Sequence, residues 1–203
     1  MSIGIYIWYT DILLYTFRGF NNVEIGIGYL PLTILGTVAA FLAGWLVARL
    51  PAQVILAIGC TCAAVSNILI ATTPKHQIYW AMIFPSMVIV AFTADLIFAS
   101  AQIIASNSVP RKYQGAAGSL IGTLLTYSMS TGLGFAGTVD VYLNKQGKDK
   151  LRGIRGAEYL AIGLAVMALV LDLVFVRIPK AVKEGWDEGD DVHNTGGEEA
   201  KSV

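Results

Sequence analysis

Long apolar stretches, separated by short polar breaks, run along almost the whole chain. A helix that crosses a bilayer needs about 20 mostly apolar residues. The stretches predict six helices, at residues 3–17, 25–48, 53–72, 78–106, 115–139 and 157–176. In lipid only helices and closed barrels satisfy every backbone group, and these stretches are too long for barrel strands. The predicted fold class is therefore all-α, a polytopic membrane protein with six transmembrane helices.

The polar segments define the rest of the domain organisation. Residues 1–180 are expected to form one six-helix bundle. Charged residues from about Asp140 to Arg155 predict a polar loop between the fifth and sixth helices. Residues 181–203 are rich in Gly, Asp and Glu and hold almost no large apolar side chains, which predicts a disordered tail.

Composition excludes several classes of protein. Charged residues make up 14% of the chain and hydrophobic residues 55%, whereas soluble domains carry about 25% charged residues. The net charge of +0 argues against nucleic-acid binding, which uses basic surfaces. Cys60 and Cys62 lie within an apolar run and are interpreted as small apolar fillers. No catalytic, phosphate-binding or metal-binding motif is present, so neither enzyme activity nor a cofactor nor a metal is predicted.

Polar residues within the apolar stretches are the candidate functional residues, because charges inside a membrane are costly and usually face a cavity or a partner. Asp95 and Gln102 share one face of the fourth helix with small residues, which indicates a substrate or proton pathway. The alternative is a structural hydrogen bond to a neighbouring helix, for example through Asn67. Asn67 and Asp11 are further candidates for the same pathway. Asp172 precedes the charged end of the last helix and is expected near the membrane interface.

Small residues recur at intervals of four, a pattern that lets transmembrane helices approach closely. In the third helix this ridge is Gly59, Ala63, Asn67 and Ala71. The predicted packing glycines of the second and fifth helices are Gly36, Gly44, Gly118, Gly122, Gly132 and Gly134. Small residues cover several faces of the fifth helix, which leaves open both static packing and sliding against a partner.

Proline and cations add two further expectations. Pro31 and Pro85 lie inside the second and fourth helices, where a missing amide hydrogen predicts a kink. The Lys and Arg residues divide almost evenly between the two sides of a six-helix bundle, so charge alone does not orient it.

Three motifs resemble one known family. The stretch PRKYQGAAGSLIGTLLTYSMSTGLGFAGTVD, residues 110–140, resembles the penultimate-helix region of fungal members of the major facilitator superfamily, in particular the fourteen-spanner drug:proton antiporters. EIGIGYLP resembles the Gly-x-x-x-Leu-Pro helix entry of that branch through Gly26, Leu30 and Pro31. GWLVAR resembles the Gly-x-Leu-x-x-Arg end of the same helix through Gly44, Leu46 and Arg49.

The resemblance implies the carboxy-terminal six-helix half of a secondary active transporter, with proton-coupled efflux of small organic compounds or drugs. The implied partners are the lipid bilayer, a small-molecule substrate, protons, and either a missing amino-terminal half of six or eight helices or a second copy of this chain. Both termini and the loops at Arg49, Arg111 and Lys112 are expected to be cytoplasmic. The plasma membrane is expected rather than the vacuolar membrane.

The sequence also departs from the family pattern. Tyr15 stands where the branch carries Gln, Asn21-Asn22 replace its Ser-Pro, and Ala48 replaces an acidic residue. At 203 residues the chain is expected to be incomplete as a transporter. The alternative function is a non-transporting membrane fragment with a packing or regulatory role.

Overall fold

A computed structural model describes residues 1–47, 49–74, 79–145 and 147–175, and these residues are mainly helical with no strand. The predicted disordered tail at 181–203 lies outside the described residues. The helices are α1 (Ser2–Arg18), α2 (Asn22–Gly28), α3 (Leu30–Val47), α4 (Ala52–Thr72), α5 (Tyr79–Asn107), α6 (Gln114–Leu143) and α7 (Lys150–Phe175), and a short 3-10 turn, η1 (Arg111–Tyr113), precedes α6. All six predicted stretches are therefore helical over most of their length.

The second stretch is divided where proline was expected to disturb it. Helix α2 ends at Gly28, and α3 begins at Leu30, one residue before Pro31. Proline at the first turn of a helix needs no amide hydrogen, so it fits the start of α3 better than the interior of one long helix. Pro85 has a different effect, because α5 continues as one helix from Tyr79 to Asn107.

The prediction of a charged loop from Asp140 to Arg155 is wrong at both ends. Helix α6 continues to Leu143, and α7 already begins at Lys150. In the short connection the Asp149 amide donates to the Asn144 carbonyl at 3.0 Å, and the Arg152 amide donates to the Asp149 side chain at 3.4 Å. Asp149 thus supplies the start signal of α7, so the charged residues after it extend the helix instead of interrupting it.

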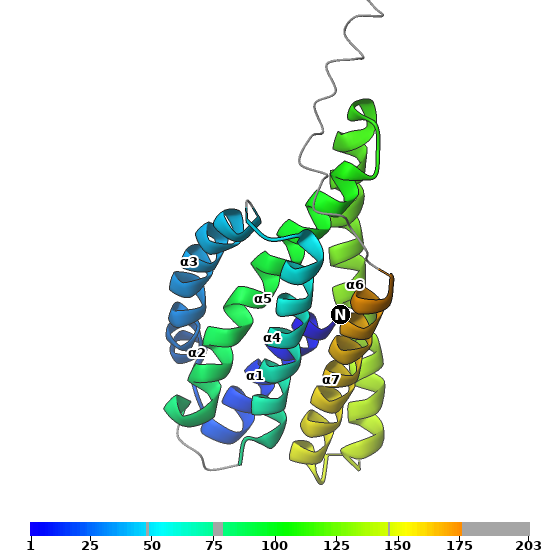
Figure 1. The fold of residues 1–203 in the computed structure, drawn as a ribbon. Helices are drawn as coiled ribbons and strands as arrows, with labels where there is room; N and C mark the ends of the chain where they lie inside the picture. Colours follow the sequence, from blue (N-terminus) through cyan, green and yellow to red (C-terminus); the bar gives the residue numbers. More distant parts are fainter. Residues whose placement is uncertain (48, 75–78, 146, 176–203) are drawn as a thin grey trace, which may run out of the picture.

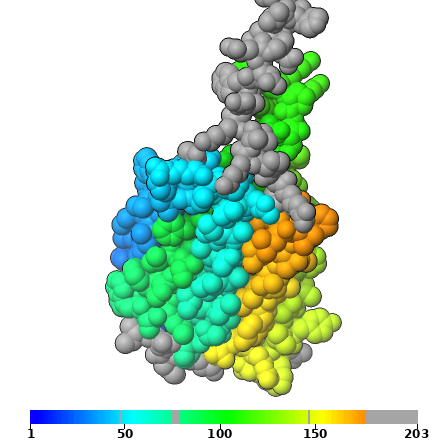
Figure 2. Space-filling view, in the orientation of Figure 1, coloured from blue at the N-terminus to red at the C-terminus, as the bar shows by residue number. Residues whose placement is uncertain are grey.

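Helix α4 lies between α5 and α7, as the space-filling view shows (Figure 2). Its predicted ridge of small residues is confirmed, since Gly59, Ala63, Asn67 and Ala71 are all buried. Helix α1 packs mainly against α7 and α6 and runs from the middle of the bundle to its lower end (Figure 1). The main apolar core forms there, around Tyr6 and Tyr9 of α1.

Four helical segments are long and apolar enough to cross a membrane: Asn22–Val47, Ala52–Thr72, Tyr79–Asn107 and Lys150–Phe175. The first of these joins α2 and α3. Helix α1 is 17 residues long, which is short for a span, and the Gly, Ser and Thr of α6 make it less apolar. The all-helical membrane class is thus supported, whereas six transmembrane helices stay a prediction.

Candidate functional site

Asp95 lines a hollow of about 150 Å³ between α1, α3 and α5. Its neighbours there include Gly36 of α3 and Ile3 and Ile7 of α1. Asp95 is half-buried, so its carboxyl lies at the edge of the packed chain. A carboxyl beside small and apolar side chains is an arrangement that can bind a proton or a cation, and the pathway role of Asp95 stays a prediction.

Asp11 lines a second hollow, of about 340 Å³, together with Trp8 and Tyr15 of α1. This hollow shares no lining residue with the one beside Asp95. The two carboxyls that the sequence assigned to one pathway therefore lie beside separate hollows in the described part of the chain.

The side-chain amides of Asn67 and Gln102 form hydrogen bonds to neighbouring helices and do not line these hollows. Asn67 is fully buried, and its Nδ2 donates to the Ser2 hydroxyl at 3.0 Å and to the Ala63 carbonyl at 2.6 Å. Gln102 Nε2 donates to the Gly118 carbonyl of α6 at 3.4 Å. Each amide thus ties two helices together, which matches the structural alternative for these residues.

The predicted packing glycines divide into two groups. A Cβ added to Gly132 would lie 2.9 Å from Met1 Cα, and one added to Gly118 would lie 3.3 Å from Gln102 Oε1. These two glycines allow contacts with α1 and α5. The others have nothing within 4 Å of an added Cβ among the described residues: Gly36, Gly44, Gly122 and Gly134. Packing at those four stays a prediction about a partner.

A larger cavity, of about 630 Å³, lies between α1, α4, α5, α6 and α7. Its wall is mainly apolar, with Asp172 as an acidic side chain and Ser128 and Cys60 as small polar ones. Asp172 is 3% exposed, and neither of its carboxyl oxygens has a hydrogen-bond partner. The Asp172 side chain therefore points into the bundle, and its expected position near the membrane interface stays a prediction.

One acidic residue was missed by sequence reasoning. Glu158 of α7 is fully buried, and both of its carboxyl oxygens lack a hydrogen-bond partner. The signal was present, since Glu158 is followed by a long run of apolar and small residues. It was overlooked because the sixth helix was expected to begin at residue 157, which put Glu158 at a membrane edge; the observed start at Lys150 places it more than two turns inside.

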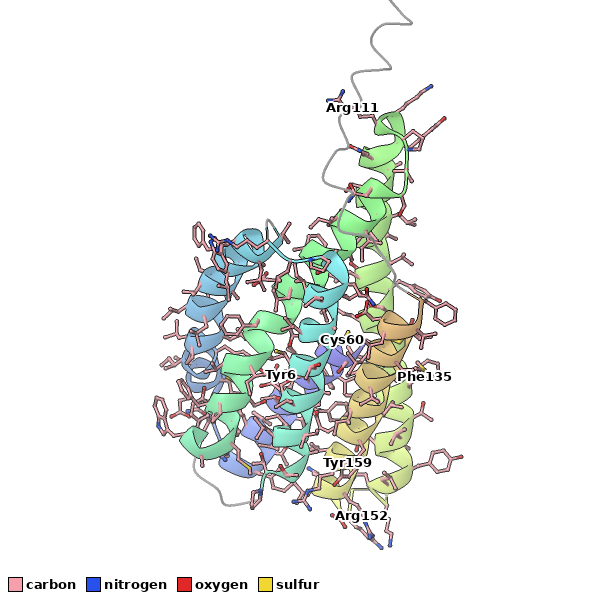
Figure 3. The ribbon with its side chains drawn as sticks, viewed as in Figure 1. Tyr6, Cys60, Arg111, Phe135, Arg152 and Tyr159 are labelled. Carbon is pink, nitrogen blue, oxygen red and sulfur yellow. The ribbon has the colours of Figure 1, made fainter. Side chains whose placement is uncertain are left out.

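The predicted loop cations gather at one end of the bundle. The turn after α3 carries Arg49, whose guanidinium lies 4.1 Å from the centre of the Trp45 ring. The hairpin between α5 and α6 carries Arg111 and Lys112 and extends beyond the neighbouring helices at the same end (Figure 1). Arg152 lies at the opposite end (Figure 3). Among the described residues no cluster of three His, Cys, Asp or Glu side chains has the arrangement of a metal site.

Relatives of known name match most of the chain. The efflux pump terJ of Aspergillus terreus is 36% identical over 86% of this chain, and the low affinity ammonium transporter of Saccharomyces cerevisiae is 37% identical over 83%. An MFS-type transporter of Schizosaccharomyces pombe is 36% identical over 85%. The matches cover 34%, 33% and 33% of these relatives, so the chain spans about a third of their length. No family model matches the chain. No solved structure matches it.

Proposed function

Because this chain is homologous to transporters of the major facilitator superfamily, we propose that it forms one half of a secondary active transporter. The transporter would export small organic compounds or drugs in exchange for protons. The observation that carries this proposal is the similarity to named efflux pumps over 86% of the chain. All these relatives are named as transporters or resistance proteins, so nothing favours the alternative of a non-transporting fragment.

The fold supports the proposal in two ways. Four segments have the length and apolarity of membrane spans, as a transporter requires. Carboxyls at Asp95 and Asp11 line hollows at the surface of the bundle, where a second half of the transporter would close them into a cavity. Major facilitator proteins place the substrate between two halves, so we assign these two hollows to the partner-facing side.

The proposed orientation follows from the resemblance to the major facilitator superfamily, because the cations alone do not orient the bundle. We place the end that carries Arg49, Arg111 and Lys112 at the cytoplasmic surface. The proposed membrane is the plasma membrane. On this orientation the connection between α6 and α7 faces outside.

A chimera tests the transport function. The segment of the Aspergillus fumigatus multidrug transporter mdr3 that aligns with this chain, at 39% identity over 140 residues, is replaced by the chain. The chimera is expressed in yeast that lacks its own drug pumps, and the accumulation of a fluorescent drug is followed. We expect the chimera to lower accumulation, and a protonophore to abolish the effect.

The matched control is the same transporter with the aligned segment deleted, which should leave drug accumulation unchanged. Surface labelling confirms that each protein reaches the plasma membrane. A chimera that reaches the surface but leaves drug accumulation at the level of the deletion control would contradict the proposed function.

A further inference from the structure

Glu158 occupies the interior of the bundle, where α7 meets α1. The face of α7 that carries it also carries Ile154, Ala157 and Ala161, which pack in one core with Tyr6 and Tyr9 of α1. Tyr6 is itself fully buried, and Figure 3 shows it inside the bundle. The carboxyl is thus enclosed by apolar groups and by aromatic side chains that carry hydroxyls.

Within the described part of the chain, no cation pairs with the Glu158 carboxyl oxygens. From α1, Tyr6 and Tyr9 lie within electrostatic reach of the carboxyl. From α6, the charged group is Asp140, an acid that interacts with Tyr9. On α7 itself, Arg155 lies one turn earlier, but its Nη2 donates to the Thr73 carbonyl at the end of α4, at 3.3 Å.

Of the neighbouring hydroxyls, that of Tyr6 has a hydrogen-bond partner and that of Thr10 has none. Ser86 of α5 lies 2.9 Å from the Tyr6 hydroxyl and donates to the Ser66 carbonyl of α4 at 2.9 Å. Thr10 of α1 is fully buried, and its hydroxyl lacks a partner. The Glu158 oxygens therefore have neither a cation nor a hydrogen-bond donor among the described residues.

The environment of Glu158 favours the protonated, neutral form of its carboxyl. An ionised carboxylate that is buried without a partner is far costlier than the neutral acid, so in this packed arrangement the carboxyl holds its proton. Ionisation requires that water, or a cation, reach the oxygens. Since α1 covers this face of α7, the access of water depends on the contact between the two helices.

We propose that Glu158 is a proton-binding site inside the bundle, closed by the packing of α1 against α7. It holds the proton on its carboxyl while the contact is closed. When the contact opens, the O–H bond breaks, the proton passes to water, and the carboxylate remains hydrated. The use of this proton in drug export rests on the proposed function; the binding site itself does not.

Infrared spectroscopy of the full chain in lipid nanodiscs tests the site directly. The C=O stretch of protonated carboxyls is recorded between about pH 5 and about pH 9, a range in which exposed carboxyls are ionised. We expect a band that persists across this range in the unchanged chain and in Glu24→Gln. Glu24 is exposed, and Gln keeps the oxygen that accepts from the Asn21 amide at 2.8 Å. The band should lose intensity in Glu158→Gln. The part that remains belongs to Asp172, the other buried carboxyl without a partner, and should be absent in Glu158→Gln/Asp172→Asn.

Circular dichroism shows whether each variant keeps its helices. Glu158→Asp, which keeps a carboxyl, is the second variant and serves if Glu158→Gln does not fold. In Glu158→Asp the band should remain with a shifted frequency. Transfer to D₂O should shift the band more slowly than exposed carboxyls exchange, because the proton leaves only when α1 and α7 separate. A band of unchanged intensity in folded Glu158→Gln, or no band in the unchanged chain, would overturn the proposal.

The mdr3 chimera separates this site from the proposed function. With Glu158→Gln we expect the chimera to lose proton-driven export, with drug counterflow down a concentration gradient retained. If the infrared band is assigned to Glu158 and export is unchanged, the binding site stands and its part in proton exchange is refuted.

Discussion

A Cβ added to Gly59 of α4 would lie only 2.7 Å from Cγ1 of Ile97 in α5. The two helices therefore approach so closely that only hydrogen fits at this position. We expect Gly59→Ala to destabilise the bundle by about 1–3 kcal/mol, the usual cost of overpacking. The change is measured as a lower unfolding midpoint in detergent, followed by circular dichroism.

Gly122 of α6 provides the control, because nothing lies within 4 Å of a Cβ added there. Gly122→Ala should be neutral, or should stabilise by up to about 1 kcal/mol through the higher helix propensity of alanine. Equal losses of stability in the two variants would show that the α4–α5 contact is looser than described.

Helix α7 contains a second close approach, at Gly156. A Cβ added there would meet the Leu143 side chain of α6 and would lie 3.2 Å from Val139 Cγ1. Gly156→Ala should therefore cost about 1–3 kcal/mol in unfolding free energy. Leu143→Ala should recover part of this loss, since it removes the atoms that the new methyl group meets.

The matched control for this pair is Gly163→Ala in the same helix, where an added Cβ meets nothing within 4 Å. Its stability should not fall, and should rise by up to about 1 kcal/mol through the higher helix propensity of alanine. If Leu143→Ala and Gly156→Ala lower stability additively, the two positions are not in contact.

Tyr6 and Ser86 link α1 to α5 through a hydroxyl pair at 2.9 Å. Tyr6→Phe removes this hydrogen bond and leaves the bond from Ser86 to the Ser66 carbonyl in place. Interhelical hydrogen bonds of this kind contribute about 0.6 kcal/mol in a membrane protein, so the expected loss of unfolding free energy is of that size. An unfolding curve in detergent measures it, with Tyr159→Phe at an exposed position as the control.

The sequence identified helices well because apolar length alone determines where a chain can lie in lipid. Which face of a helix packs was harder to predict. The ridge through Gly59 is buried as expected, yet in α3 the buried residues are Ala39 and Ala43, while Gly36 and Gly44 have open space. Small residues mark several possible contacts, and only the neighbouring helices select among them.

The charged connection before α7 shows a second limit of pattern reading. Lys and Arg near a helix start look like loop residues, but Asp149 begins a helix that carries them. Glu158 was missed for the same reason. The surroundings of Asp95 could not be predicted either, because the hollow that it lines together with Gly36 depends on how the helices cross in space.

The ends of the bundle can be assigned to sides of the membrane by labelling. After Cys60 and Cys62 are replaced by alanine, single cysteines are introduced at Arg49, Lys112 and Arg152. A maleimide that cannot cross membranes should label the first two from one side and Arg152→Cys from the other, because the α3–α4 turn and the α5–α6 hairpin share one end (Figure 1). Labelling of Arg49→Cys and Lys112→Cys from opposite sides would contradict the described topology.

Asp95 carries the proposed pathway, so its charge should matter more than its size. In the mdr3 chimera, Asp95→Asn keeps the shape of the side chain in its 150 Å³ hollow but removes the ionisable group. We expect drug export to fall about tenfold or more, the effect of losing about 1.4 kcal/mol of stabilisation, while surface labelling stays unchanged. Asp149→Asn is the control, since Asn also caps a helix and lies outside the hollow. Export at the unchanged level in both variants would make Asp95 a packing residue.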